Sequence, residues 1–173
     1  LLIQRAIDVL GGLDILVANA GYALKTPITD ISDEDFETAH ATIARSFFEL
    51  ATAAVPYLEK SNCGRVVGIS AFGPHVWRTK VTPFAATAAA KASMEVTAKA
   101  LALQLAPSGI TVNLIAPGFV RKDQKAHVAI SPEILHKLVA EVPMGRVAEP
   151  EEIASAVAFC ASSEASYITG QVI

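Results

Sequence analysis

Cysteine is scarce in this chain, and so are long apolar runs. The two cysteines among 173 residues, Cys63 and Cys160, are far apart and match no zinc-binding spacing. A domain of this size can build a sufficient core without disulfides, so we expect a reducing, cytoplasmic compartment. The longest apolar stretch, residues 85–105, is broken by three charged side chains, so we expect no membrane partner.

Clusters of like charge are also missing. The 14 basic and 17 acidic residues give a net charge of −3 without any basic block, so nothing favours nucleic acid as a partner. Residues 1–7 lack the basic start and the cleavage site of a signal peptide. They have the pattern of an amphipathic helix with no cap before it, so we expect that the chain is truncated or that its upstream part is absent.

Helical and strand-like segments alternate along the chain. Short apolar runs predict buried strands, the last one cut short, at residues 14–19, 65–70, 110–116 and 169–173. Longer amphipathic or alanine-rich segments between capping and breaking residues predict helices at 1–10, 33–60, 84–106, from Pro132 onward and at 150–162. This alternation indicates the α/β class, with a parallel sheet covered by helices on both faces.

Parallel sheets of this class bind ligands beyond the carboxyl ends of their strands. Three segments follow the predicted strand ends, and they are the first places to look for a site. They are residues 19–21, 70–83 and 117–122.

Five motifs occur in an order that resembles one known enzyme family. They are LDILVANAG (13–21), GRVVGIS (64–70), GITVNLIAPG (109–118), PMGRVAEPEE (143–152) and YITGQV (167–172). Together they resemble the short-chain dehydrogenase/reductase family over nearly the whole chain, which implies a Rossmann-like doubly wound parallel sheet. Family members begin with a glycine-rich phosphate loop, and nothing here matches one, so we expect the first three strands to be absent. Residues 1–173 would then form a single domain, the C-terminal two-thirds of a Rossmann-type domain.

The resemblance implies NAD or NADP as the cofactor, and no metal. It places small or turn-forming residues after two strands against that cofactor: Asn19, Ala20, Gly21, Pro117 and Gly118. It also implies that Lys91 holds the nicotinamide ribose. The family often has a threonine four residues beyond the Pro-Gly glycine, and this chain has Lys122 there.

The acid–base pair of the family is a Tyr-x-x-x-Lys motif, in which the nearby ammonium lowers the pKa of the phenol. Lys91 matches the lysine, but Thr87 stands four residues before it. The divergent enoyl-acyl-carrier-protein reductase branch spaces its tyrosine and lysine by six residues, and that register places Phe84 at the tyrosine. Both registers therefore lack the phenol. Thr87 is the candidate with a hydroxyl, which is less acidic and has a shorter reach.

Other polar roles are altered as well. Ser70 resembles the serine that polarises the substrate, although an ungapped match places Ala71 at that position. The family's mid-helix asparagine would fall near Ile43, where no asparagine occurs. Without the phenol, the proton could come from water, from His75, since a histidine can supply a proton near neutral pH, or from Tyr22, just after the Asn19-Ala20-Gly21 turn.

The sequence therefore predicts an NAD(P)-dependent oxidoreductase acting on a small carbonyl, alcohol or enoyl substrate. Enoyl reduction suits the missing phenol better, because the alkene carbon can take its proton from solvent. The alternative is a non-redox relative, either a catalytically impaired binding protein or an enzyme similar to halohydrin dehalogenases, which keep Ser and Tyr with an Arg. Helices 33–60 and 84–106 correspond to the usual dimer surface of the family, so we expect a homodimer or homotetramer.

Overall fold

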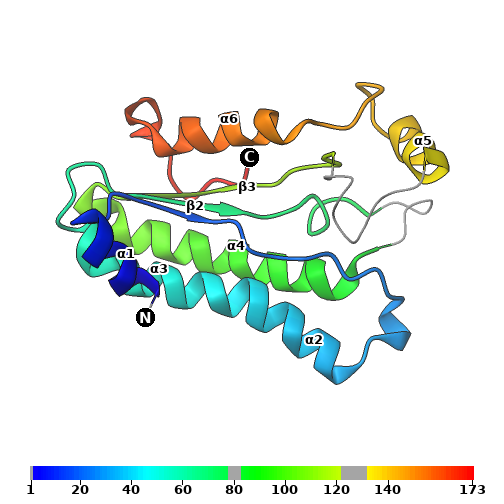
Figure 1. Ribbon diagram of the computed structural model, residues 1–173, viewed down its shortest axis with the longest axis horizontal. Coiled ribbons are helices and arrows are strands. Elements are labelled where there is room, and N and C mark those ends of the chain that lie inside the picture. Colours follow the sequence, from blue (N-terminus) through cyan, green and yellow to red (C-terminus); the bar gives the residue numbers. More distant parts are fainter. Residues whose placement is uncertain (1, 78–82, 122–131) are drawn as a thin grey trace.

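The computed structural model describes residues 2–77, 83–121 and 132–173, and they form three layers (Figure 1). A parallel sheet is the middle layer. Helices from the first two-thirds of the chain cover one face, and a helix near the C-terminus covers the other. The predicted α/β class is thereby confirmed. In the part of the chain that the structure describes, no helix is both long enough and apolar enough to cross a membrane.

The sheet contains strands β1 (Ile15–Ala18), β2 (Arg65–Ile69) and β3 (Thr111–Ile115), which lie in that order and are all parallel. In the register of the sheet, Val17 lies opposite Val67 of β2. The strands β2 and β3 are buried almost throughout, as expected for a sheet covered on both faces. Each end of these three strands lies within one residue of its predicted position.

The predicted fourth strand, residues 169–173, is wrong in extent. Only one parallel bridge forms there, between Val172 and Leu114 of β3. Gly170 has a φ of 71°, which no extended strand adopts, although its amide donates to the Val112 carbonyl at 2.7 Å. The segment therefore pairs with β3 without forming a regular strand. The segment still extends the sheet on the β3 side.

The helical layer on the first face holds the larger core. Its elements are α1 (Leu2–Leu10), α2 (Asp33–His40), the π-helical turn η2 (Ala41–Arg45), α3 (Ser46–Leu58) and α4 (Ala85–Leu105). The largest side chains buried between this layer and the sheet are Ile43, Phe47, Leu58, Val66, Met94, Leu105, Ile110, Val112 and Leu114.

The predicted helix 33–60 is continuous but not regular. Ser32 caps it, and its Oγ accepts a hydrogen bond from the Asp35 amide at 3.1 Å. At η2 the winding widens, and the amide of Ser46 donates to the carbonyl of Ala41 five residues earlier. The hydrophobic spacing predicts the extent of such a helix, but it does not reveal an extra residue in one turn.

The second face is covered by α6 (Pro150–Ala161), which follows α5 (Pro132–Ala140) along the chain. A smaller core lies beneath α6 and contains Val67, Ile115 and Cys160. Val66 and Val67 thus point into different cores, as the two-residue period of a strand requires. Cys160 is a buried core residue, as its place in the helical pattern predicts.

Candidate functional site

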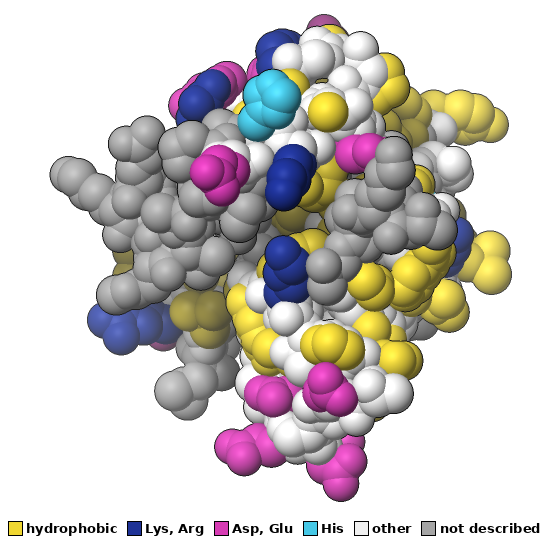
Figure 2. All heavy atoms as spheres, turned by 90° about the vertical axis from the view of Figure 1, so that its right-hand side faces the viewer, with side chains coloured by type: hydrophobic (Ala, Val, Ile, Leu, Met, Phe, Trp, Pro, Cys, Tyr) yellow, Lys and Arg dark blue, Asp and Glu magenta, His cyan; other side chains and the backbone are white. Residues whose placement is uncertain are grey.

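The carboxyl ends of the three strands and the first turn of α4 lie at the same end of the molecule (Figure 1). Figure 2 looks onto this end, where hydrophobic side chains line a hollow between basic ones. Acidic side chains gather below it, where α2 begins with Asp33, Glu34 and Asp35. The predicted site residues all come from the segments that meet here.

Lys91 lies on α4 and points under the strand ends. Only 6% of its surface is exposed, and its ammonium donates a hydrogen bond to the carbonyl oxygen of Ile69, the last residue of β2. Its Nζ lies 3.3 Å from the position that a Cβ on Gly21 would occupy, so the absence of a side chain there leaves room for the amine. Burial lowers the pKa of Lys91 to about 8, against the opposing effect of the negative charge of Glu95.

Thr87 lies one turn before Lys91 and is also buried. Its hydroxyl accepts a hydrogen bond from the Leu24 amide at 3.0 Å and donates to the Tyr22 carbonyl at 3.3 Å. Both partners belong to the loop that follows β1. The Thr87 hydroxyl therefore ties this loop to α4, and its proton is already donated to a backbone carbonyl.

Ser70 follows β2, and it is buried as well. Its hydroxyl donates to Oε1 of Glu95, one turn beyond Lys91 on α4. The same carboxylate oxygen lies 3.0 Å from Nε2 of His75, in the loop after β2. Glu95 is not among the predicted site residues, although a carboxylate four residues after Lys91 in an alanine-rich helix is a usable signal.

The loops after β2 and β3 lie against each other. The Phe72 amide donates to the Pro117 carbonyl at 3.1 Å, and the rings of Phe72 and Phe119 are 5.0 Å apart in an edge-to-face contact. Gly118 is exposed, so its backbone is accessible beside the strand ends. The predicted cofactor residues Asn19 and Ala20 are exposed at the end of β1.

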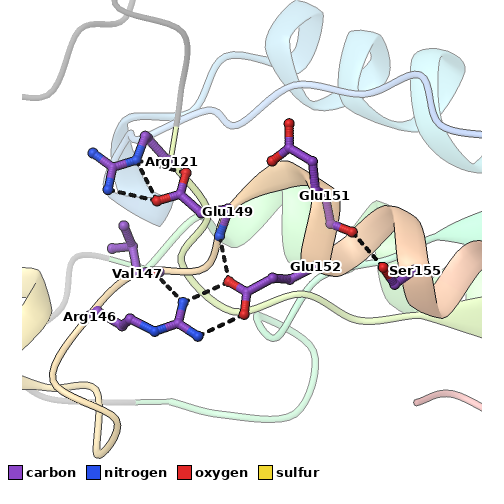
Figure 3. A network of polar contacts seen from close by, with 7 residues as sticks. All are labelled: Arg121, Arg146, Val147, Glu149, Glu151, Glu152 and Ser155. Atoms are coloured by element: carbon purple, nitrogen blue, oxygen red, sulfur yellow. Dashed lines mark hydrogen bonds and ion pairs between the residues drawn. The ribbon is translucent and has the colours of Figure 1, made fainter.

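A network of charged side chains holds the segment after Gly118 against the start of α6 (Figure 3). The Nη2 atom of Arg121 lies 2.7 Å from Oε1 of Glu149, and Arg146 Nη1 lies 2.6 Å from Oε2 of Glu152. The Glu152 carboxylate also accepts from the Glu149 amide at 2.9 Å, which caps α6. The hydrogen bond from Arg146 is the largest cause that lowers the pKa of Glu152 to about 2.

Lys122 and Ile43 are two further positions at which the sequence departs from the family pattern. Lys122, which replaces the family's threonine, lies outside the described residues. Ile43 is buried in η2, and its Cγ1 lies 3.6 Å from the Cβ position of Gly21. An apolar side chain thus occupies the place where the resemblance puts an asparagine.

The residues at the strand ends fit a nicotinamide cofactor. Gly118 has open space where a side chain would lie, Asn19 and Ala20 are exposed at the end of β1, and Lys91 supplies a cation beneath the strand ends. Within residues 2–77, 83–121 and 132–173, no group of three or more His, Cys, Asp or Glu side chains could hold a metal ion.

Comparison with known proteins identifies the family of the chain. The sequence profile of the family described as enoyl-(acyl carrier protein) reductase matches residues 1–173. The 3-oxoacyl-(acyl-carrier-protein) reductase FabG of Salmonella typhimurium is 40% identical over 163 residues, which are 94% of this chain and 65% of that protein. A tropinone reductase homolog of Arabidopsis thaliana is 34% identical over 173 residues, 99% of this chain and 64% of its own length. The chain thus spans slightly less than two-thirds of these relatives.

Solved structures give the same picture. The TT0495 protein of Thermus thermophilus superposes with a TM-score of 0.90 at 34% identity, over 99% of this chain and 72% of its own. A halohydrin dehalogenase superposes with a TM-score of 0.88 at 26% identity, over 99% of this chain and 70% of its own. The profile match over residues 1–173, the Rossmann-type sheet and these relatives together show that the chain belongs to the short-chain dehydrogenase/reductase family.

Proposed function

We propose that the chain carries the catalytic part of an NAD(P)-dependent oxidoreductase acting on a small carbonyl, alcohol or enoyl group. Residues 1–173 then form the C-terminal two-thirds of a Rossmann-type domain in a cytoplasmic enzyme. The observation that carries the proposal is Lys91, a cation held almost out of solvent under the strand ends. A buried ammonium is costly unless a partner or a function compensates for it, and the carbonyl of Ile69 is a neutral acceptor.

When bound, the nicotinamide supplies or accepts the hydride. Lys91 holds the ribose, and the segments Asn19–Gly21 and Pro117–Gly118 line the groove in which the cofactor lies. Ser70 polarises the substrate oxygen only if its hydroxyl turns away from Glu95, to which it donates here. Thr87 positions the loop after β1, since its two hydrogen bonds end on that backbone.

The substrate is a carbonyl or enoyl compound, for which the relatives supply the support. FabG and the tropinone reductase homolog are named as reductases, and the matching profile is described as an enoyl reductase. An enoyl group has the advantage that its alkene carbon can take a proton from solvent, so that no acidic phenol is needed. A crotonyl thioester and an acetoacetyl thioester, each offered with NADH and with NADPH, separate the two substrate classes.

Cofactor binding is the decisive test, and the chain offers a matched control. The full-length protein, including the upstream strands that the resemblance implies, is titrated with NADH and with NADPH, and binding is followed by fluorescence. Lys91→Met should weaken binding by about tenfold or more, as expected for a lost hydrogen bond to a charged group. Lys99→Met, which removes an exposed lysine from the same helix, should leave binding unchanged. Failure of the wild-type protein to bind either nucleotide would refute the proposal.

A non-redox activity is the second candidate, because a halohydrin dehalogenase is among the similar structures and Thr87 replaces the phenol. Bromide release from a vicinal halohydrin, without any nicotinamide, is the corresponding test. Release at a rate above that of a Lys91→Met control, together with no nucleotide binding, would favour this candidate.

A further inference from the structure

Three of the polar groups at the strand ends already have a partner for their protons. Thr87 donates to the Tyr22 carbonyl, Lys91 to the Ile69 carbonyl and Ser70 to Glu95. A reductase nevertheless has to supply a proton as well as a hydride when it reduces a carbonyl. Carbonyl reduction therefore requires another group in this region that can gain and lose a proton.

His75 and Glu95 form a carboxylate–imidazole pair beside these groups. Nε2 of His75 lies 3.0 Å from Oε1 of Glu95. The carboxylate is nearly enclosed, with 7% of its side chain exposed, whereas 43% of the imidazole side chain is exposed. A buried carboxylate that accepts from one ring nitrogen fixes the tautomer and stabilises the protonated ring.

The hydrogen bonds among Ser70, His75 and Glu95 exclude Ser70 as a nucleophile. In a hydrolase the serine donates to the imidazole, and the imidazole donates to the acid. Here both Ser70 and His75 make their hydrogen bond to the same oxygen of Glu95. The serine therefore has no base, and it helps to hold the carboxylate that orients the ring.

The loop that carries His75 lies beside the predicted nicotinamide face. The His75 amide donates to the Phe72 carbonyl at 2.9 Å, and the Phe72 amide donates to the Pro117 carbonyl. With Nε2 directed at Glu95, the second ring nitrogen, Nδ1, is the one that remains to exchange a proton with a ligand.

We propose that His75, oriented by Glu95, delivers the proton that a tyrosine delivers elsewhere in the family. This inference rests on the proposed oxidoreductase function. In the reducing direction the hydride forms a C–H bond at the carbonyl carbon, and the carbonyl oxygen takes the proton from Nδ1. The imidazole is left neutral, with its Nε2–H still bonded to Glu95, and solvent returns the proton.

Two charged side chains of α4 lie near the His75 ring. Among the described residues, Glu95 of α4 is the charged group in contact with His75, and Lys91 stands one turn away, where it interacts with Glu95. The donor must be protonated to deliver its proton, so reduction should be slower at high pH than at low pH.

The first test needs neither substrate nor variant activity. Nitrogen-15 NMR of the histidine rings in the intact protein should show His75 with its neutral proton on Nε2, and Glu95→Gln should abolish that preference. A ring of mixed tautomers in the wild-type protein would overturn the inference. His40, which is partly exposed and bonded to its own helix backbone, provides the reference ring.

The second test is kinetic. His75→Gln should lower kcat for carbonyl reduction by about 100-fold, as for loss of a general acid, with unchanged NADH and NADPH binding and a flattened pH profile. His40→Gln should behave like the wild type. An unaltered kcat and pH profile in His75→Gln would overturn the inference while the oxidoreductase proposal stands. Absence of nucleotide binding in the wild type would instead refute that underlying proposal, and the proton-delivery role with it.

Discussion

Lys91 is a charged residue that is buried in largely apolar surroundings. It sits in a helix made mainly of alanine, and its ammonium is bonded to one backbone carbonyl. The folded protein binds the Lys91 proton less tightly than the unfolded chain does, because burial lowers the pKa from 10.5 to about 8. Stability should therefore depend on pH at this one residue.

Between pH 8 and 10.5 the unfolded state carries the extra proton, so the free energy of unfolding should rise with pH in this interval. The Lys91 contribution to that rise is about 3 kcal/mol. Lys91→Met should lack it, whereas Lys99→Met should retain it. Urea unfolding of the three proteins at pH 7.5 and 10.5 measures the difference, and identical pH dependence in Lys91→Met and wild type would contradict the prediction.

The two possible positions for a phenol differ in the space around them. Phe84 precedes α4 and is half-buried, so Phe84→Tyr should change stability by less than about 0.5 kcal/mol. Thr87 is 7% exposed and bonds the Leu24 amide, so Thr87→Tyr should lose about 2 kcal/mol or more through overpacking and an unpaired amide. Thermal unfolding compares the two variants. Equal stability would show that the space at Thr87 is larger than its burial indicates.

At the scale of elements, the start of α6 depends on the carboxylate of Glu152. It accepts from the Glu149 amide and pairs with Arg146, and both contacts lower its pKa to about 2. A depressed pKa stabilises the folded state above the ordinary value of 4.5, and this contribution is lost as pH falls towards 2.

Glu152→Gln should therefore lower the Tm at pH 7, and the difference from wild type should disappear near pH 2. Glu151→Gln is the matched control, because this neighbour contributes only its backbone carbonyl to the network in Figure 3. Scanning calorimetry from pH 2 to 7 provides the measurement. A Tm difference that stays constant over this range would show that the charge of Glu152 is not responsible.

Most elements could be predicted from the sequence, because hydrophobic periodicity and breaking residues determine where helices and strands begin and end. The contacts of the site could not. Glu95 and Ser70 are 25 residues apart, and only the packing of α4 on β2 brings them together. The hydroxyl of Thr87 bonds to backbone groups. Because nearly every residue carries such groups, the sequence does not indicate which of them Thr87 contacts. The position of Lys91 at the strand ends was predictable because a family motif and an interrupted apolar helix agreed.

At the scale of the whole molecule, the outer sides of α3 and α4 carry large apolar side chains. Phe48 is 53% exposed, Val96 69% and Leu103 81%, and the last two share a helix face because they are seven residues apart. Leu103→Glu should shift the proposed homodimer or homotetramer to smaller species, as light scattering after size exclusion would show. Val9→Glu, at an equally exposed position on α1, should leave the mass unchanged. An unaltered mass for Leu103→Glu would place the subunit contact elsewhere.

Because of the wide turn η2, the long helix should tolerate the deletion of one residue within 41–45 but not in its regular parts. Each α-helical residue advances the helix by about 100°, so removing a residue from the middle of α3 would rotate Leu58 out of the core. Removing one residue from 41–45 would convert the turn to regular winding and leave the faces of α2 and α3 where they are. The helix thus carries a spare residue, and a shortened form of the protein could dispense with it while the rest of the fold keeps its register.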